Sequence, residues 1–176
     1  MMDYQPKLPG ATSPRGPHRA RLHGGVPMTG ADYANLVAAY VARRFAHRSL
    51  RVYREIRIGK TIIGKNRCID IFCVAEDSQK AFAIECKYQD SQGTVDEKIP
   101  YALEDLLALP MAGCIAYAGQ GFSDGVRHML AASRHAAYCL PAEGQTETTA
   151  DTRELDHMLA VHFGWWDVLI ERKKPV

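Results

Sequence analysis

The stretch AFAIECKYQ at residues 81–89 sets Glu85, Lys87 and Gln89 at alternate positions among apolar side chains. Successive side chains of a β-strand point to opposite faces, so these three polar residues share one face. The apolar residues that face the other way are Phe82, Ile84, Cys86 and Tyr88. We therefore expect a strand that packs one face into the core and presents a carboxylate and an ammonium on the other.

A second carboxylate, Asp70, interrupts the apolar segment RCIDIFCVA at residues 67–75, which predicts another strand. If this strand pairs with the first through the turn EDSQ, Asp70 lies beside Glu85, with Lys87 close by. Two neighbouring carboxylates repel each other unless a cation lies between them. We expect Asp70 and Glu85 to bind Mg²⁺ or Mn²⁺, because carboxylate oxygens suit these ions.

These groups suit metal-assisted hydrolysis of a phosphodiester bond. A divalent ion stabilises the leaving oxygen and lowers the pKa of its water. The Lys87 ammonium would add positive charge near the attacking water or the scissile phosphate. The alternative is purely structural, with the charges of Glu85 and Lys87 forming an ion pair with Asp70 at the surface.

The rest of the chain predicts helices and strands that can position this pair of strands. Apolar residues at helical spacing predict a first helix over residues 29–48, with Thr29 as its N-cap. Strands are predicted over residues 50–58, 67–75, 80–89, 112–119 and 137–141. Further helices are predicted over residues 96–109, 123–136 and 151–164. The early strands suit antiparallel hairpins and the later helical crossovers suit parallel neighbours, so we expect an α/β fold with a mixed sheet and helices on both faces.

An Asp in CIDIF followed by Glu-x-Lys in IECKYQ, on two apolar strands in this order, resembles the PD-(D/E)xK nuclease superfamily. Restriction endonucleases and Holliday junction resolvases share its core of a helix, three strands, a helix and a strand. The resemblance covers roughly residues 30–140. It implies a restriction endonuclease-like fold, Asp70 and Glu85 on the metal, and Lys87 beside the nucleophilic water. Gln89 matches a Gln found at that position in some relatives and is included as catalytic.

The sequence departs from the superfamily pattern at two places. Many resolvase-like members carry a metal-binding Glu on the first helix, and residues 29–48 contain none. Glu55, on the strand 50–58, is a substitute metal ligand, although charge pairing with Arg51 and Arg57 on the same strand face is the favoured interpretation. The residue before Asp70 is Ile69 instead of Pro, a variation that the superfamily tolerates.

Basic residues near the two strands are candidate contacts for nucleic-acid phosphates. They are Lys60, Lys65 and Arg67 in and after the first hairpin, with Lys98 further on. A solvated hairpin is the open alternative. Thr94 and Glu97 fit a capping box, but we favour Pro100 as the first helical residue, which leaves residues 90–99 as a loop.

The 176-residue chain is 47% hydrophobic and 24% charged, which suits one globular domain. Residues 1–28 are rich in Pro and Gly and hold four basic residues against one acid. We expect a disordered basic tail there, with a net charge of +3, and a single nuclease-like domain over residues 29–176, which carries −1 of the overall +2.

The expected location is the cytoplasm. The sequence has no apolar run long enough to span a membrane and no secretory signal. Its five cysteines show no metal-ligand spacing and suit small buried residues in a reducing compartment. Trp165 and Trp166 are expected to close the core beneath the last helix, with base stacking as the alternative.

The expected function is therefore a divalent-metal-dependent nuclease that acts on nucleic acid, with DNA favoured over RNA. The alternative is a catalytically inert nucleic-acid-binding module on the same fold. Intact Asp70, Glu85 and Lys87 favour the enzyme, and the missing helix carboxylate favours the module. Substrate specificity stays open, and so does the pairing of two chains as a homodimer to cut two strands.

Overall fold

The fold follows from a computed structural model that describes residues 27–91, 95–171 and 173–174. The chain begins with α1 (Gly30–Arg44) and a short 3₁₀ turn, η1 (Ala46–Arg48). The elements that follow are β1 (Leu50–Lys60), β2 (Asn66–Ala75), β3 (Lys80–Tyr88), α2 (Val95–Leu107), β4 (Gly113–Ala118), α3 (Asp124–Ala132), β5 (Ala136–Tyr138), α4 (Arg153–Phe163) and α5 (Trp166–Ile170). This confirms the predicted order of elements, and the structure adds the 3₁₀ turn and α5.

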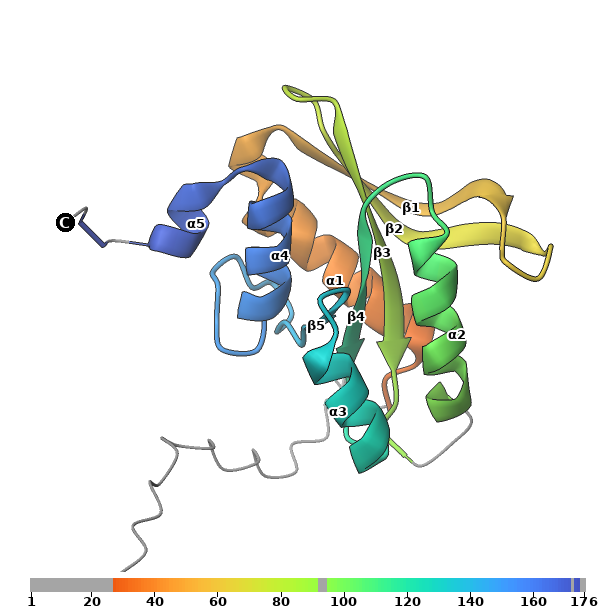
Figure 1. The fold of residues 1–176 in the computed structure, drawn as a ribbon. Coiled ribbons are helices and arrows are strands. Elements are labelled where there is room, and N and C mark those ends of the chain that lie inside the picture. Colours follow the sequence, from red (N-terminus) through yellow and green to blue (C-terminus); the bar gives the residue numbers. More distant parts are fainter. Residues whose placement is uncertain (1–26, 92–94, 172, 175–176) are drawn as a thin grey trace, which may run out of the picture.

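One five-stranded sheet runs through the domain in the order β1-β2-β3-β4-β5. β1, β2 and β3 pair antiparallel through short turns, whereas β3, β4 and β5 pair parallel through the crossover helices α2 and α3. The predicted mixed sheet is therefore confirmed. The β1–β2 hairpin extends past the other strands and ends in an exposed turn (Figure 1).

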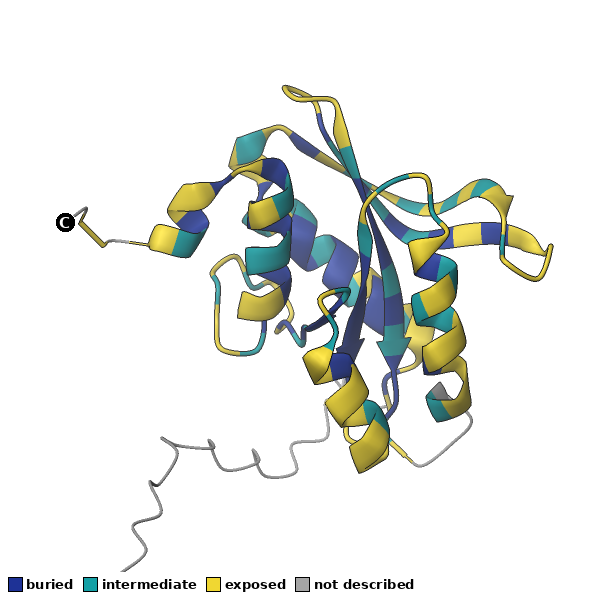
Figure 2. Cartoon of the chain, viewed as in Figure 1, coloured by how far each residue is buried: buried dark blue, intermediate teal, exposed yellow. Residues whose placement is uncertain are grey.

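Helices cover both faces of the sheet (Figure 1). The larger core joins α1, α4 and α5 to one face and includes Phe82, Ile84, Cys86 and Tyr88 of β3, as the strand alternation predicted. The smaller core joins α2 and α3 to the other face, through Ile99 and Leu106 of α2 and Ile115 of β4. Buried residues concentrate in β3 and β4, between these two layers (Figure 2). Glu85 and Lys87 belong to the α2 face of the sheet.

Two polar contacts hold α1 in place. Thr29 and Asp32 form a reciprocal capping box at its start, so Thr29 is the N-cap that the sequence predicted. The hydroxyl of Tyr40 lies 2.7 Å from Oδ2 of the fully buried Asp156 on α4. This buried link ties α1 to α4 across the large core.

The structure corrects the predicted start of α2. The helix begins at Val95, five residues before Pro100, so Pro100 lies inside the helix and Lys98 is helical, not part of a loop. Pro lacks the N–H that would bond to the carbonyl of Asp96, so α2 lacks this hydrogen bond in its first turns. Thr94, the proposed capping residue, lies outside the described residues.

Three single residues also refine the sequence predictions. Cys68 is exposed, while the other four cysteines are buried. Trp165 is buried in the large core as expected, whereas Trp166 is 56% exposed. Met28, which the sequence pattern placed in the tail, is buried in the core, so the folded domain begins before residue 29. Residues 1–26 of the predicted tail lie outside the described residues. None of the helices in the described ranges is long and apolar enough to cross a membrane.

Candidate active site

Asp70 lies where β2 separates from β3. The antiparallel register of these strands runs from Ala75 opposite Lys80 and ends at Ile71 opposite Ile84, one residue before Asp70. Beyond that point β3 continues in its parallel pairing with β4. Instead of a backbone partner on β2, the main-chain N–H of Cys86 donates to Oδ2 of Asp70 at 2.8 Å. The Asp70 side chain thus occupies the opening between the two strands.

The other edge of β2 is also irregular at Asp70. On β1 the pairs Arg54–Ile71 and Ile56–Ile69 flank Glu55, whose backbone adopts a left-handed φ of 56° that is uncommon for a residue other than glycine. The guanidinium Nε of Arg54 donates to the carbonyl oxygen of Asp70 at 2.7 Å. A side chain therefore satisfies this carbonyl where the ladder is interrupted.

Glu85 and Lys87 form the pair that their spacing predicted. Nζ of Lys87 lies 3.6 Å from Oε2 of Glu85, and the two side chains are 24% and 20% exposed, respectively. Burial raises the pKa of Glu85 to about 7, and the charge and hydrogen bond of the adjacent Asp70 carboxylate add to this, although the Lys87 ammonium opposes it. Asp70 and Glu85 thus lie close enough to interact, as the sequence indicated.

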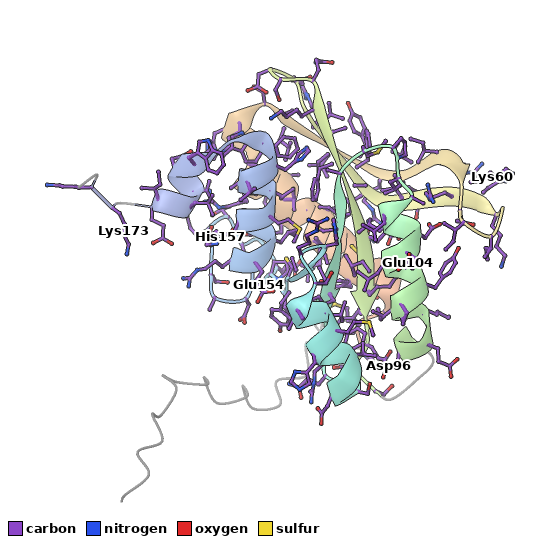
Figure 3. The ribbon with its side chains drawn as sticks, in the orientation of Figure 1. Lys60, Asp96, Glu104, Glu154, His157 and Lys173 are labelled. Carbon is purple, nitrogen blue, oxygen red and sulfur yellow. The ribbon has the colours of Figure 1, made fainter. Side chains whose placement is uncertain are left out.

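A cavity of about 710 Å³ opens in front of Glu85 and Lys87. Its floor is β3, and its sides are the outer half of the β1–β2 hairpin and one face of α2. Lys65 and Lys98, both expected to contact nucleic acid, line this cavity. Lys60 is exposed near the end of the hairpin, where its Nζ is 2.6 Å from Oδ1 of Asn66 (Figure 3). The structure therefore brings Lys65 and Lys98 next to the predicted catalytic pair.

Arg67 also lines the cavity, but its charge is already paired. Its side chain is 6% exposed and makes a two-pronged contact with the Asp105 carboxylate on α2, with Nε–Oδ2 and Nη2–Oδ1 distances of 3.0 and 2.8 Å. Oδ1 of Asp105 also accepts the main-chain N–H of Ile62 in the hairpin turn. Burial opposes ionisation of Asp105, yet the hydrogen bonds from Arg67 and Ile62 hold its pKa below the ordinary value. Arg67 thus fastens the hairpin to α2.

Gln89 follows the last residue of β3, and its side chain is committed to residues outside the strand. It is 5% exposed and donates through Nε2 to the carbonyl oxygen of Gly121 at 2.7 Å. Its backbone carbonyl accepts the N–H of Gly121 at 2.8 Å. Gln89 is absent from the cavity lining, so the structure does not bring it together with Glu85 and Lys87. Its contacts hold the loop after β4 against the end of β3.

Glu55, the substitute metal ligand, is exposed on β1. Within the described residues no group of three or more His, Cys, Asp or Glu side chains is arranged to hold a metal ion. Asp70 and Glu85 are therefore the two carboxylates that the fold brings together, and their oxygen donors fit a hard divalent cation such as Mg²⁺, which often takes one or two carboxylates and completes its shell with water or phosphate. Glu55 remains a prediction as a ligand.

Two residues that line the cavity were missed from the sequence. Tyr101 and Asp105 follow Lys98 at intervals of three and four residues along α2, so they share one helix face. That spacing is readable in the sequence once the helix is extended back to Val95. The tie between Asp105 and Arg67 was not readable, because it joins residues 38 positions apart.

A mixed sheet with helices on both faces, carrying two carboxylates and a lysine at a fork between its second and third strands, defines a nuclease-type fold. The family model of the PD-(D/E)XK nuclease superfamily domain matches residues 29–166. The chain therefore belongs to that superfamily, as the two motif strands predicted.

Other comparisons are more distant. A crystal structure described as "Protein of Unknown Function AF1548" has a TM-score of 0.37 and 16% sequence identity, and the match covers 56% of this chain. The match covers 53% of that protein, so the chain spans about half of its length. The search of curated proteins found no match.

Proposed function

We propose that this protein is a divalent-metal-dependent nuclease that hydrolyses phosphodiester bonds in nucleic acid, with DNA as its substrate. The observation that carries the proposal is that Asp70 lies beside Glu85, with Lys87 3.6 Å from Glu85 and a cavity in front of Glu85 and Lys87. Carboxylates that can hold a divalent ion, with an ammonium beside them, suit metal-assisted phosphodiester hydrolysis.

The metal would be held by Asp70 and Glu85. An ion bound there, Mg²⁺ or Mn²⁺, would neutralise charge on the scissile phosphate and favour ionisation of an attacking water. Asp70 is prepared for this role, because the Cys86 N–H fixes one of its oxygens. Glu85 is also suited to it, since burial and the adjacent Asp70 raise the pKa of its carboxyl, and a bound cation would favour the ionised form.

Lys87 would act on the reacting phosphate. Its ammonium is mostly buried and lies beside Glu85, so its interaction with developing negative charge is less screened than in water. It can also orient the attacking water by hydrogen bonding. Lys65 and Lys98, at the sides of the cavity, would contact neighbouring phosphates, and Lys60 would extend this contact along the hairpin.

The proposal is tested by a cleavage assay on plasmid, linear duplex, single-stranded and branched DNA and on RNA. Wild-type protein with Mg²⁺ or Mn²⁺ is expected to cleave at least one DNA substrate, and a chelator is expected to stop the reaction. Asp70→Asn should abolish it, whereas Asp77→Asn, an exposed Asp in the β2–β3 turn, should not. Cleavage that survives Asp70→Asn would contradict the proposed site.

The second candidate is an inert nucleic-acid-binding module on the same fold. Two observations favour it: the side chain of Gln89 is committed to Gly121, and α1 contributes only Gly30 to the cavity lining. This candidate predicts binding of DNA by the wild type with no metal-dependent cleavage of any substrate in the panel. Cleavage abolished by Asp70→Asn would exclude it.

A further inference from the structure

The cavity in front of Glu85 and Lys87 has a wall that phosphodiester chemistry does not require. The α2 residues that line it recur at helical spacing and form one face: Lys98, Tyr101, Ala102, Asp105 and Leu106. Leu109, just after the helix, also lines the cavity. Tyr101 keeps 36% of its surface exposed on this wall. The wall is therefore largely apolar, with one accessible aromatic ring.

The opposite wall is the turn of the β1–β2 hairpin. Ile63 lines the cavity from this side and is 59% exposed, and Lys65 follows it. The turn is fixed at a set distance from α2, because Asp105 binds both the Ile62 N–H, at 2.7 Å, and the guanidinium of Arg67. These polar contacts thus join the two walls and fix their spacing.

The basic side chains that line the cavity differ in whether a carboxylate neutralises them. The Arg67 guanidinium is neutralised by Asp105, and the Lys87 ammonium is paired with Glu85. Lys65 and Lys98 remain as the basic residues of the two side walls. An apolar cleft with an aromatic side chain and basic residues on both sides matches the surfaces that bind single-stranded nucleic acid by base stacking and phosphate contact.

We propose that this cavity receives one unpaired nucleobase of the DNA substrate, with its face against Tyr101 and its flanking phosphates near Lys65 and Lys98. The cavity volume of about 710 Å³ lies within the usual range for sites that enclose small organic groups. A base in an intact duplex cannot enter such a pocket without unstacking and unpairing, which costs free energy. The preferred substrate is therefore DNA with a single-stranded, bulged or displaced nucleotide beside the cut.

This proposal rests on the proposed nuclease function only for the position of the cut, and its test is a binding measurement. The protein carries Asp70→Asn to prevent cleavage during the measurement. This substitution leaves the cavity lining unchanged, because Asp70 is not among the cavity-lining residues. Fluorescence anisotropy compares a labelled duplex, the same duplex with one bulged nucleotide, and the same bulge with an abasic site. We expect the bulged duplex to bind about tenfold more tightly than the paired one, and the abasic bulge to lose most of that gain.

Variants test whether the preference for the bulged duplex depends on the cavity. Tyr101→Ala should bring the affinity for the bulged duplex down to that for the paired duplex, whereas Tyr101→Phe should retain the preference because the ring remains. Trp166→Ala, which removes an exposed aromatic side chain of α5 outside the cavity lining, should retain it as well. Circular dichroism verifies that each variant is folded.

The two proposals fail separately in these experiments. Equal affinity for the paired and bulged duplexes, or a preference that survives Tyr101→Ala, would overturn the nucleobase pocket even if the wild type cleaves DNA. A preference lost in Tyr101→Ala would support the pocket even if the wild type cleaves nothing, a result that would contradict the nuclease proposal alone.

Discussion

The carboxylate of Asp70 takes the place of a backbone partner for Cys86. Its Oδ2 accepts the Cys86 N–H at 2.8 Å, one residue beyond the last paired residues of β2 and β3. The Cys86 N–H therefore keeps an acceptor although the two strands separate there. The same hydrogen bond places the Asp70 carboxylate near Glu85, the residue before Cys86 on β3. The hydrogen bond from the Cys86 N–H thus links the end of the β2–β3 pairing to the candidate metal site.

Mg²⁺ or Mn²⁺ is expected to raise the melting temperature of the wild type, since a ligand that binds the native state alone stabilises it. Asp70→Asn should lose this response and still fold, because an amide oxygen can accept the Cys86 N–H. Differential scanning calorimetry with and without metal measures the effect, with Asp77→Asn as the matched control. An equal response in wild type and Asp70→Asn would count against the site.

Glu85 should make the metal-free protein less stable as the pH rises. Its folded pKa of about 7 exceeds its ordinary value of 4.5, so the native state binds more protons than the unfolded state between these values. The stabilisation is therefore fully present below pH 4.5 and is lost as the pH rises through about 7, with an upper limit of about 3 kcal/mol.

Urea unfolding in a chelator tests this linkage at about pH 5 and about pH 8. Glu85→Gln cannot ionise at this position, so the difference in unfolding free energy between Glu85→Gln and wild type should grow in favour of the variant at the higher pH. A difference that stays constant across this interval would show that Glu85 titrates as an ordinary carboxyl.

The contact between Arg67 and Asp105 should stabilise the domain, because it is buried and two-pronged. Asp105→Ala is expected to lower the unfolding free energy by about 2 kcal/mol, since it leaves the buried guanidinium and the Ile62 N–H without their acceptor. The exposed pair Arg51–Glu76 offers a control, and Glu76→Ala should have little effect. A double-mutant cycle with Arg67→Ala that finds no coupling would refute the assigned role.

The fold and the proximity of Asp70, Glu85 and Lys87 could be predicted because their signals are local. Alternation along β3 fixes the face of Glu85 and Lys87, and a short turn brings Asp70 beside them. The partner of Gln89 could not be predicted from this alternation, because its side-chain amide bonds to the carbonyl of Gly121, 32 positions further along the chain. Arg67 was counted as a free base because its partner, Asp105, depends on how α2 docks against the hairpin. The contacts of Gln89 and Arg67 depend on how distant elements pack together, which local sequence patterns do not show.

The basic tail should add affinity for nucleic acid without affecting the chemistry. Truncation should remove residues 1–26 only, because Met28 is part of the core. The truncated protein is expected to bind DNA less tightly at low salt, with a salt slope reduced by about 0.9 for each phosphate that the tail neutralises. A full-length variant with Ser at Lys7, Arg15, Arg19 and Arg21 controls for chain length and should behave like the truncation. Parallel salt dependences with equal affinity would leave the tail without a role in binding.

The rate of metal-dependent DNA cleavage by Lys87→Ala tests the account most directly. Single-turnover assays at saturating protein should compare it with wild type and with Lys80→Ala, an exposed lysine at the start of the same strand. We predict a loss on the order of 10²–10³ in the cleavage rate for Lys87→Ala, with an unchanged metal-dependent rise in melting temperature, and a wild-type rate for Lys80→Ala. Cleavage at the wild-type rate by a folded Lys87→Ala protein would contradict the proposed catalytic role of the Asp70, Glu85 and Lys87 site.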